Sequence, residues 1–179
     1  MMAFMTTHLI LVTGGTRSGK SSFAQNLAEE APGRKAFIAT AEPLDREMKE
    51  RIACHREERP AEWDTVEEPL HLAETVKKCG EAYDVLLIDC LTLWISNLLV
   101  NKSMMEKAIL KKIGDLLTSC RTVSARVIMV TNELGMGIVP SNRLSRIYRD
   151  LVGKANQQVA AEADEVYFLV SGMPMKLKG

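Results

Sequence analysis

The stretch VTGGTRSGKSSF, residues 12–23, decides the fold of this chain. Within it, Gly14 to Ser21 match the pattern G-x-x-x-x-G-K-[ST], a glycine-rich turn that ends in a lysine and a hydroxyl side chain. An apolar run precedes the turn and a helical pattern follows it, which is the context that the pattern requires. The glycines let several backbone N–H groups point at one anion, and the helix N-terminus adds positive charge. The stretch therefore predicts a phosphate-binding loop between a strand and a helix.

The chemistry of the loop indicates a nucleotide with a metal ion. Lys20 can reach the β and γ phosphates, and the Ser21 hydroxyl can bind Mg²⁺. Asp89 ends the apolar run VLLID, and a carboxylate there suits a Mg²⁺ that phosphates hold, directly or through a water. Ligands of open parallel sheets bind beyond the carboxyl ends of the strands. The polar or glycine residues expected at those ends are Gly14, Thr40, Asp89, Asn132 and Ser171.

The rest of the chain repeats the alternation of strand and helix. Five continuously apolar runs predict strands that are covered on both faces, at residues 9–13, 36–40, 85–89, 127–132 and 166–170. Helical patterns lie between them, one from Met105 to Cys120 and a longer one whose apolar face runs from Leu144 to Val159. Pro140-Ser141-Asn142 offers that helix a capped start. We expect an α/β fold with a doubly wound, mostly parallel sheet, forming one nucleotide-binding domain over residues 1–179.

Composition limits the classes of partner. Lys plus Arg and Asp plus Glu both number 23 in 179 residues, so the net charge is zero and no basic excess indicates a nucleic-acid partner. The start of the chain carries no basic leader, and the apolar run after it is too short for a signal or membrane segment. The four cysteines form no CxxC pair, so we expect reduced thiols in a cytoplasmic protein. A metal cluster of these cysteines with His55 is the less favoured alternative.

One histidine stands out within a charged segment. The stretch EPLDREMKERIACHREERP, residues 42–60, predicts a helix in which Leu44, Met48 and Ile52 are spaced by four. His55 follows three residues later and continues that apolar stripe. An imidazole there can be a nucleophile, a proton carrier or a plain core residue, and the pattern alone favours the core residue. His8 and His71 are interpreted as structural or surface residues.

Four segments in order carry a resemblance to a known family. They are ILVTGGTRSGKSSFAQ, FIATAEPLDREMKERIACHREERPAEWDTVEEP, LLIDCLTLWISNLL and VTNELGMGIVPSNRLSRIYRDLVGKANQQVAAEADEVYFLVSGMPMKLK. Together they resemble the bifunctional adenosylcobinamide kinase / adenosylcobinamide-phosphate guanylyltransferase family of cobalamin biosynthesis. The resemblance implies a P-loop NTPase fold of RecA-like type and a homotrimer. It also implies two reactions: ATP or GTP phosphorylates adenosylcobinamide, and GTP then guanylylates an enzyme histidine that passes GMP to adenosylcobinamide phosphate.

The resemblance assigns roles to residues of this chain. His55 falls at the guanylylated histidine, and Lys20 is the second catalytic residue. Ser21 and Asp89 are the expected Mg²⁺ ligands, although Asp89 is a glutamate in some relatives. The expected nucleotide contacts are Gly14, Gly15, Thr16, Arg17, Ser18, Gly19, Lys20, Ser21, Ala39, Thr40, Ala41, Arg56, Glu57, Glu58, Arg59, Glu67 and Asp89. Because only a neutral imidazole attacks phosphorus, guanylylation is expected to fall on acidification.

The stretch TNELGMGIVP and the helix after it leave alternatives open. It is either a tight connection or a wall of the corrinoid site, with Arg143, Arg146 and Arg149 as a ridge that is solvated, binds substrate or meets another subunit. Rival functions also stay open at this point. A one-step small-molecule kinase would leave His55 structural, a RecA-type nucleotide switch or ATPase would need a partner surface, and the kinase step could be lost while guanylylation is kept.

Overall fold

The computed structural model describes residues 8–57 and 59–179, apart from the side chains of Glu47, Arg51, Cys54, His55 and Glu57. Its strands are β1 (Leu9–Gly14), β2 (Lys35–Ala39), β3 (Asp64–Glu67), β4 (Val85–Asp89), β5 (Arg126–Val130), β6 (Glu165–Val170) and β7 (Met173–Lys178). Its helices are α1 (Lys20–Glu29), α2 (Arg46–Glu57), α3 (Leu72–Gly80), α4 (Leu91–Ser96), the π-helix η1 (Asn97–Asn101), α5 (Glu106–Thr122) and α6 (Arg143–Glu162).

The strands form one seven-stranded sheet in the order β3-β2-β4-β5-β1-β6-β7. All neighbouring pairs are parallel except β6 and β7, which form an antiparallel hairpin at one edge. Strand β5 lies between β1, which leads into the glycine-rich turn, and β4, which ends in Asp89. The α/β fold with a mostly parallel sheet is therefore confirmed.

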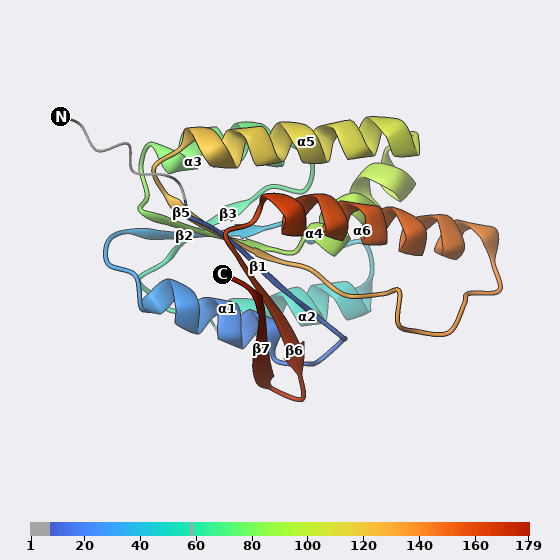
Figure 1. Cartoon of the computed structure of the whole chain (residues 1–179), viewed down its shortest axis with the longest axis horizontal. Coiled ribbons are helices and arrows are strands. Elements are labelled where there is room, and N and C mark those ends of the chain that lie inside the picture. Colours follow the sequence, from blue (N-terminus) through green and yellow to red (C-terminus); the bar gives the residue numbers. More distant parts are fainter. Residues whose placement is uncertain (1–7, 58) are drawn as a thin grey trace.

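Helices cover both faces of the sheet (Figure 1). Helices α3, α4, α5 and α6 lie on one face, and α1 and α2 lie on the other. The two hydrophobic clusters of buried residues follow this division. The larger contains residues of α3, α4, α5 and α6, and the smaller packs α1 and Trp63 against the opposite face of the central strands. Alternate residues of each central strand enter one cluster or the other, which explains why these strands are continuously apolar.

The predicted elements are confirmed with small shifts at their ends. The capped start of α6 is also confirmed, because the Asn142 side chain accepts a hydrogen bond from the Ser145 backbone N–H at 2.7 Å. The apolar stripes are wrong at three positions. Leu144 is 52% exposed, Met105 is 78% exposed at the N-cap of α5, and Leu44 is 67% exposed before α2 begins. Each lies at or outside a helix end, where the opposing layer no longer covers the side chain.

Two further expectations concern the state of the cysteines and the presence of a membrane segment. In the described part of the chain, Cys79, Cys90 and Cys120 are free and buried. Burial raises the pKa of the Cys90 and Cys120 thiols to about 12, so both are poor nucleophiles. No helix among the described residues is long and apolar enough to span a membrane.

Candidate functional site

The glycine-rich turn forms a tight loop between β1 and α1. Gly19 is the N-cap of α1 and has a φ of 90°, a left-handed conformation that glycine adopts without strain. A side chain on Gly14 would lie 2.5 Å from the Leu169 carbonyl oxygen of β6. The hairpin supports the loop, because the Gly172 backbone N–H donates to the Ser18 carbonyl at 2.9 Å. Gly19, Lys20 and Ser21, at the N-terminus of α1, line a cavity in front of the loop.

Lys20 lies inside this loop rather than in solvent. Its side chain curls back so that Nζ donates to the Gly15 carbonyl at 2.5 Å, and the residue is 7% exposed. Burial lowers the pKa of the Lys20 amine, and the negative charge of Asp89 opposes this shift. The ammonium group is thus held where a bound phosphate chain would replace the Gly15 carbonyl as its partner.

Ser21 and Asp89 meet although 68 residues separate them in the chain. The Ser21 Oγ donates to the Asp89 Oδ2 at 2.8 Å, which joins the first turn of α1 to the end of β4. The sequence analysis paired these two residues as Mg²⁺ ligands, and the structure brings them together. A hydroxyl and a carboxylate oxygen at this distance are hard donors of the kind that Mg²⁺ prefers.

A cavity of about 490 Å³ opens in front of the loop. One wall is polar and consists of residues 16–22, Asp89 and Asn132. A second part of the lining is apolar and includes Phe37 of β2 and Met48 and Ile52 of α2. The apolar stripe expected on α2 is therefore turned toward a cavity. Such a volume with one polar and one apolar wall fits a nucleotide, which has a charged and a stacking end.

Arg59 is the most distinctive cation at the apolar wall. Its guanidinium lies 3.9 Å from the centre of the Phe37 ring, and it lines the cavity. Its Nε is buried and has no hydrogen-bond partner among the described residues. Burial lowers the pKa of Arg59, and the nearby Arg56 adds to that shift. A buried Nε–H without an acceptor is an expensive arrangement unless a ligand supplies one.

The other predicted nucleotide contacts divide into two groups. Ala39, Ala41 and Glu67 line the cavity, and Glu67 forms an ion pair with Arg56. The Thr40 side chain instead is fully buried and binds the backbone of Cys90 twice, with hydrogen bonds of 2.8 Å to its N–H and its carbonyl. Gly14 and Gly15 shape the loop without lining the cavity.

His55 is only partly placed. Its backbone belongs to α2, three residues after Ile52 of the cavity wall, while its side chain lies outside the described residues. The same holds for the side chain of Glu57 and for the whole of Glu58. The role of His55 as nucleophile therefore stays a prediction.

Asn132 is a cavity residue that the sequence analysis placed at a strand end without giving it a role. Its backbone N–H donates to the Thr92 hydroxyl at 2.8 Å, and its carbonyl accepts from the Asn156 amide at 3.0 Å. Thr131 next to it donates to the other end of the same Asn156 amide, at 2.8 Å. The Asn132 side chain makes no hydrogen bond to the described residues and lines the cavity. A fixed backbone with a free amide is typical of a ligand-binding position.

These features define the class of the protein. A glycine-rich loop before a helix, a buried lysine and a hydroxyl–carboxylate pair, all at the carboxyl edge of a parallel sheet, are those of a P-loop nucleotide-binding protein. Residues 10–177 match the family model described as cobinamide kinase / cobinamide phosphate guanyltransferase. The chain belongs to this family.

Three related proteins match the sequence of this chain over nearly their full length. The chain is 44% identical to the bifunctional adenosylcobalamin biosynthesis protein CobU of Salmonella typhimurium, over 95% of this chain and 99% of the relative. It is 43% identical to the protein of the same name from Escherichia coli, with the same coverage. It is 45% identical to the bifunctional adenosylcobalamin biosynthesis protein CobP of Pseudomonas aeruginosa, over 94% of this chain and 96% of the relative.

Proposed function

We propose that this protein is a bifunctional enzyme of cobalamin biosynthesis that phosphorylates adenosylcobinamide and then guanylylates the product. The phosphoryl donor is ATP or GTP, and the guanylyl donor is GTP. One nucleotide-binding domain carries both reactions. The observation that supports the proposal most directly is the cavity, because the phosphate loop forms one wall and helix α2, which contains His55, contributes to the other.

In the guanylyl transfer, His55 attacks the α-phosphorus of GTP. A P–N bond forms, the bond from the α-phosphorus to the oxygen that bridges to the β-phosphate breaks, and pyrophosphate leaves. A phosphate oxygen of adenosylcobinamide phosphate then attacks the same phosphorus, and the P–N bond breaks to regenerate the imidazole. The histidine thus divides one transfer into two easier steps. Arg59 supplies a positive charge and an unused donor beside the bound guanine nucleotide.

The phosphate loop serves both reactions. Lys20 and the N–H groups at the start of α1 stabilise negative charge on the phosphates. Ser21 and Asp89 are the residues that would hold Mg²⁺, and their oxygen donors fit that ion. When bound, the ion neutralises part of the charge of the phosphate chain. The enzyme acts in the cytoplasm, where nucleoside triphosphates are available.

The position of the label in GTP tests the proposal. Purified protein with Mg²⁺ is incubated with GTP labelled at the α-phosphate and, in parallel, with GTP labelled at the γ-phosphate. We expect acid-labile label on the protein from the α-position alone. Label on the protein from the γ-position, or none from either, would contradict the guanylyl-enzyme. Release of ADP from ATP that depends on adenosylcobinamide tests the kinase step separately.

We also expect Asn132→Ala to slow the kinase step without affecting the fold. Asn132 lines the cavity and follows β5, which lies between β1 and β4 in the sheet, so we expect its amide to donate to the transferred phosphate. A hydrogen bond to a charged group is worth about 1.5–3 kcal/mol, so kcat should fall about tenfold or more. The melting temperature should stay unchanged, because only the backbone of Asn132 is bonded to the described residues. An unchanged kcat, or a fall that tracks a lower melting temperature, would contradict the prediction.

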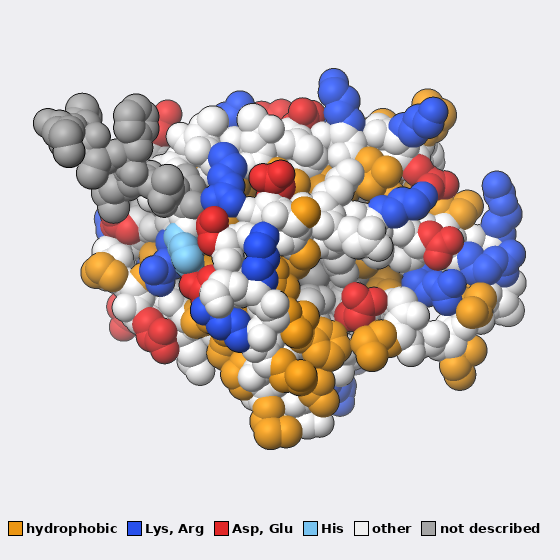
Figure 2. All heavy atoms as spheres, viewed as in Figure 1, with side chains coloured by type: hydrophobic (Ala, Val, Ile, Leu, Met, Phe, Trp, Pro, Cys, Tyr) orange, Lys and Arg blue, Asp and Glu red, His pale blue; other side chains and the backbone are white. Residues whose placement is uncertain are grey.

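For assembly we propose a homotrimer whose subunits meet at the β6–β7 hairpin. Val170, Met173 and Met175 are 43%, 65% and 53% exposed, and they share one face, because Val170 pairs with Met173 and Phe168 with Met175. Apolar side chains gather over this hairpin in Figure 2. An exposed apolar patch on a strand pair is typical of a protein interface.

The double variant Met173→Lys, Met175→Lys is therefore expected to dissociate the assembly. Two charges on the hairpin face would have to be buried at the interface without partners. Light scattering should give three times the subunit mass for the parent protein and the subunit mass for the variant. Lys176→Ala, on the same strand, serves as the control and should stay trimeric. A variant that keeps the parent mass would place the interface elsewhere.

A further inference from the structure

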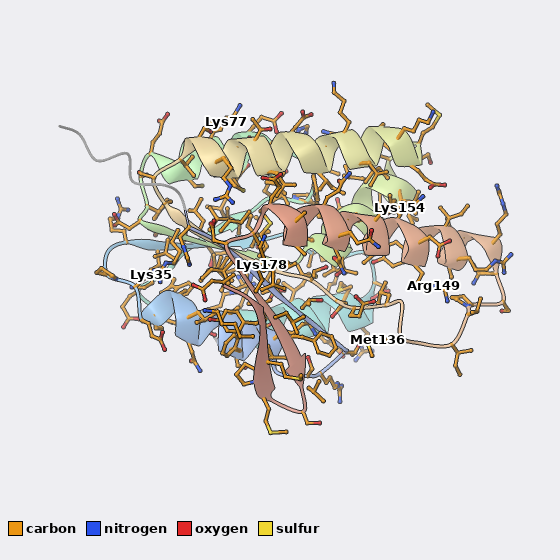
Figure 3. All side chains as sticks on the ribbon, in the orientation of Figure 1. Lys35, Lys77, Met136, Arg149, Lys154 and Lys178 are labelled. Carbon is orange, nitrogen blue, oxygen red and sulfur yellow. The ribbon has the colours of Figure 1, made fainter. Side chains whose placement is uncertain are left out.

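The connection between β5 and α6 carries a second exposed apolar surface. We call residues 134–139 the apolar loop. Met136, Ile138 and Val139 are 79%, 97% and 62% exposed, so three large apolar side chains on one short segment face solvent. Figure 3 shows Met136 on this loop, away from the helix that carries Arg149. The sequence is compatible with either a tight connection here or a wall of the corrinoid site.

Hydrogen bonds lie on both sides of the apolar loop. On the side of β5, the Gly135 N–H donates to the Glu133 carboxylate at 2.7 Å. On the side of α6, Arg146 donates to the carbonyls of Pro140 and Ser141 at 3.0 and 2.6 Å. Arg146 is thus half-buried and fixes the loop instead of forming a solvated ridge. Three large exposed apolar side chains on one short segment are typical of an interaction surface.

The apolar loop begins at the phosphate site. The Glu133 N–H, one residue before the loop, donates to the carbonyl of Gly14 at 2.9 Å. Asn132, the residue before that, lines the cavity. The apolar loop therefore starts within two residues of the cavity lining, on the side of the phosphate loop.

The size of the acceptor also indicates that it binds on the surface beside the cavity. A cavity of about 490 Å³ is in the range of a pocket for one drug-sized ligand, and a nucleoside triphosphate takes up most of it. A corrin macrocycle with its amide side chains cannot enter as well. Only the arm that bears the reacting hydroxyl can reach the phosphates, so the macrocycle must rest on the protein surface beside them. Such a macrocycle is a large and partly apolar ligand.

We propose that the apolar loop is the docking surface for the corrin macrocycle of the acceptor, with Met136, Ile138 and Val139 against one face of the ring. This inference rests on the proposed function and names the part of the site that holds the acceptor. The apolar contact supplies affinity, and the position of the loop beside Gly14 and Asn132 directs the arm of the acceptor into the cavity.

The test compares the double variant Met136→Ser, Ile138→Ser with the parent protein. Equilibrium dialysis with cobinamide, in the presence of a non-hydrolysable GTP analogue, gives the Kd of the corrinoid without any turnover. We expect the Kd of the variant to rise about tenfold or more, because the substitutions remove apolar area from the contact. The KM for adenosylcobinamide should rise in parallel, while the KM for ATP stays unchanged. Met105→Ser is the matched control, since Met105 is 78% exposed at the N-cap of α5, and it should leave every value unchanged.

An unchanged Kd for cobinamide in the double variant would overturn the inference. If the mass of that variant by light scattering is also lower, the apolar loop contacts a second copy of the chain instead. Guanylylation of the enzyme by GTP needs no corrinoid, so it should proceed normally in the variant. A failure of that half-reaction in the parent protein would overturn the proposed function instead, and the two failures are thereby separate.

Discussion

His55→Ala is expected to abolish guanylyl transfer while sparing phosphorylation of adenosylcobinamide. An imidazole nitrogen is proposed as the nucleophile that forms the P–N bond, and alanine has no side-chain nucleophile. Loss of a covalent nucleophile lowers a rate by about 10⁴-fold or more. Transfer of the γ-phosphate from ATP to the acceptor needs Lys20 and the loop but no protein nucleophile. The variant should therefore carry no label from α-labelled GTP and should still release ADP when adenosylcobinamide is present.

A matched variant makes this result specific. His71→Ala removes an exposed histidine at the N-cap of α3, and this variant should be labelled like the parent protein. Equal loss of both activities in His55→Ala would instead indicate a structural role for His55. Retention of label in that variant would assign the nucleophile to another residue and contradict the family-based assignment. Measurement over a range of pH adds a second readout, because labelling of the parent protein should weaken on acidification as the imidazole becomes protonated.

Lys20→Met is expected to depress both reactions together. Its ammonium group is buried in the phosphate loop, and its stem fills space that methionine also fills, so the fold should be preserved. Removing one preorganised donor to developing charge costs about a hundredfold to a thousandfold in rate. We expect losses of this size in kcat/KM for the kinase step and in the rate of protein labelling.

The control for Lys20→Met is a variant that keeps the positive charge. Lys20→Arg keeps a cation but has a larger, planar head that the Gly15 carbonyl cannot accommodate in the same place, so partial recovery is expected. Thermal unfolding should give similar melting temperatures for all three proteins. A loss confined to one reaction would show that the two reactions do not share the phosphate loop, which contradicts the single-cavity proposal.

The sequence predicted the central fold because the strands involved are buried on both faces. Strands β1 and β4 are nearly free of exposed residues, so their apolar runs were unambiguous. Strand β3 and strand β7 were not predicted, because both lie at sheet edges and carry exposed side chains throughout or nearly so. Helix α3 was also missed, in the charged segment after His55 where no strand boundary marked it.

For the site, prediction succeeded where a motif or a strand end fixed the residue. Ser21 and Asp89 meet as expected, because parallel strands place their carboxyl ends at one edge. Phe37 was not identified, since a single aromatic residue inside a strand looks like any core residue until Arg59 is found above it. Thr40 was correctly placed at a strand end, but its hydroxyl does not line the cavity. It donates to the Cys90 carbonyl instead.

The contact between Ser18 and Gly172 has a practical consequence for anyone who trims or extends this protein. The final strand looks dispensable, because every residue of β7 is exposed and it lies last in the chain. Yet its turn with β6 is one of the supports of the loop that holds phosphate, and Gly172 approaches so closely that a side chain on Gly19 would lie 3.2 Å from its Cα. A C-terminal deletion or a bulky fusion at this end should therefore be judged by nucleotide affinity first, and by yield or melting behaviour only afterwards.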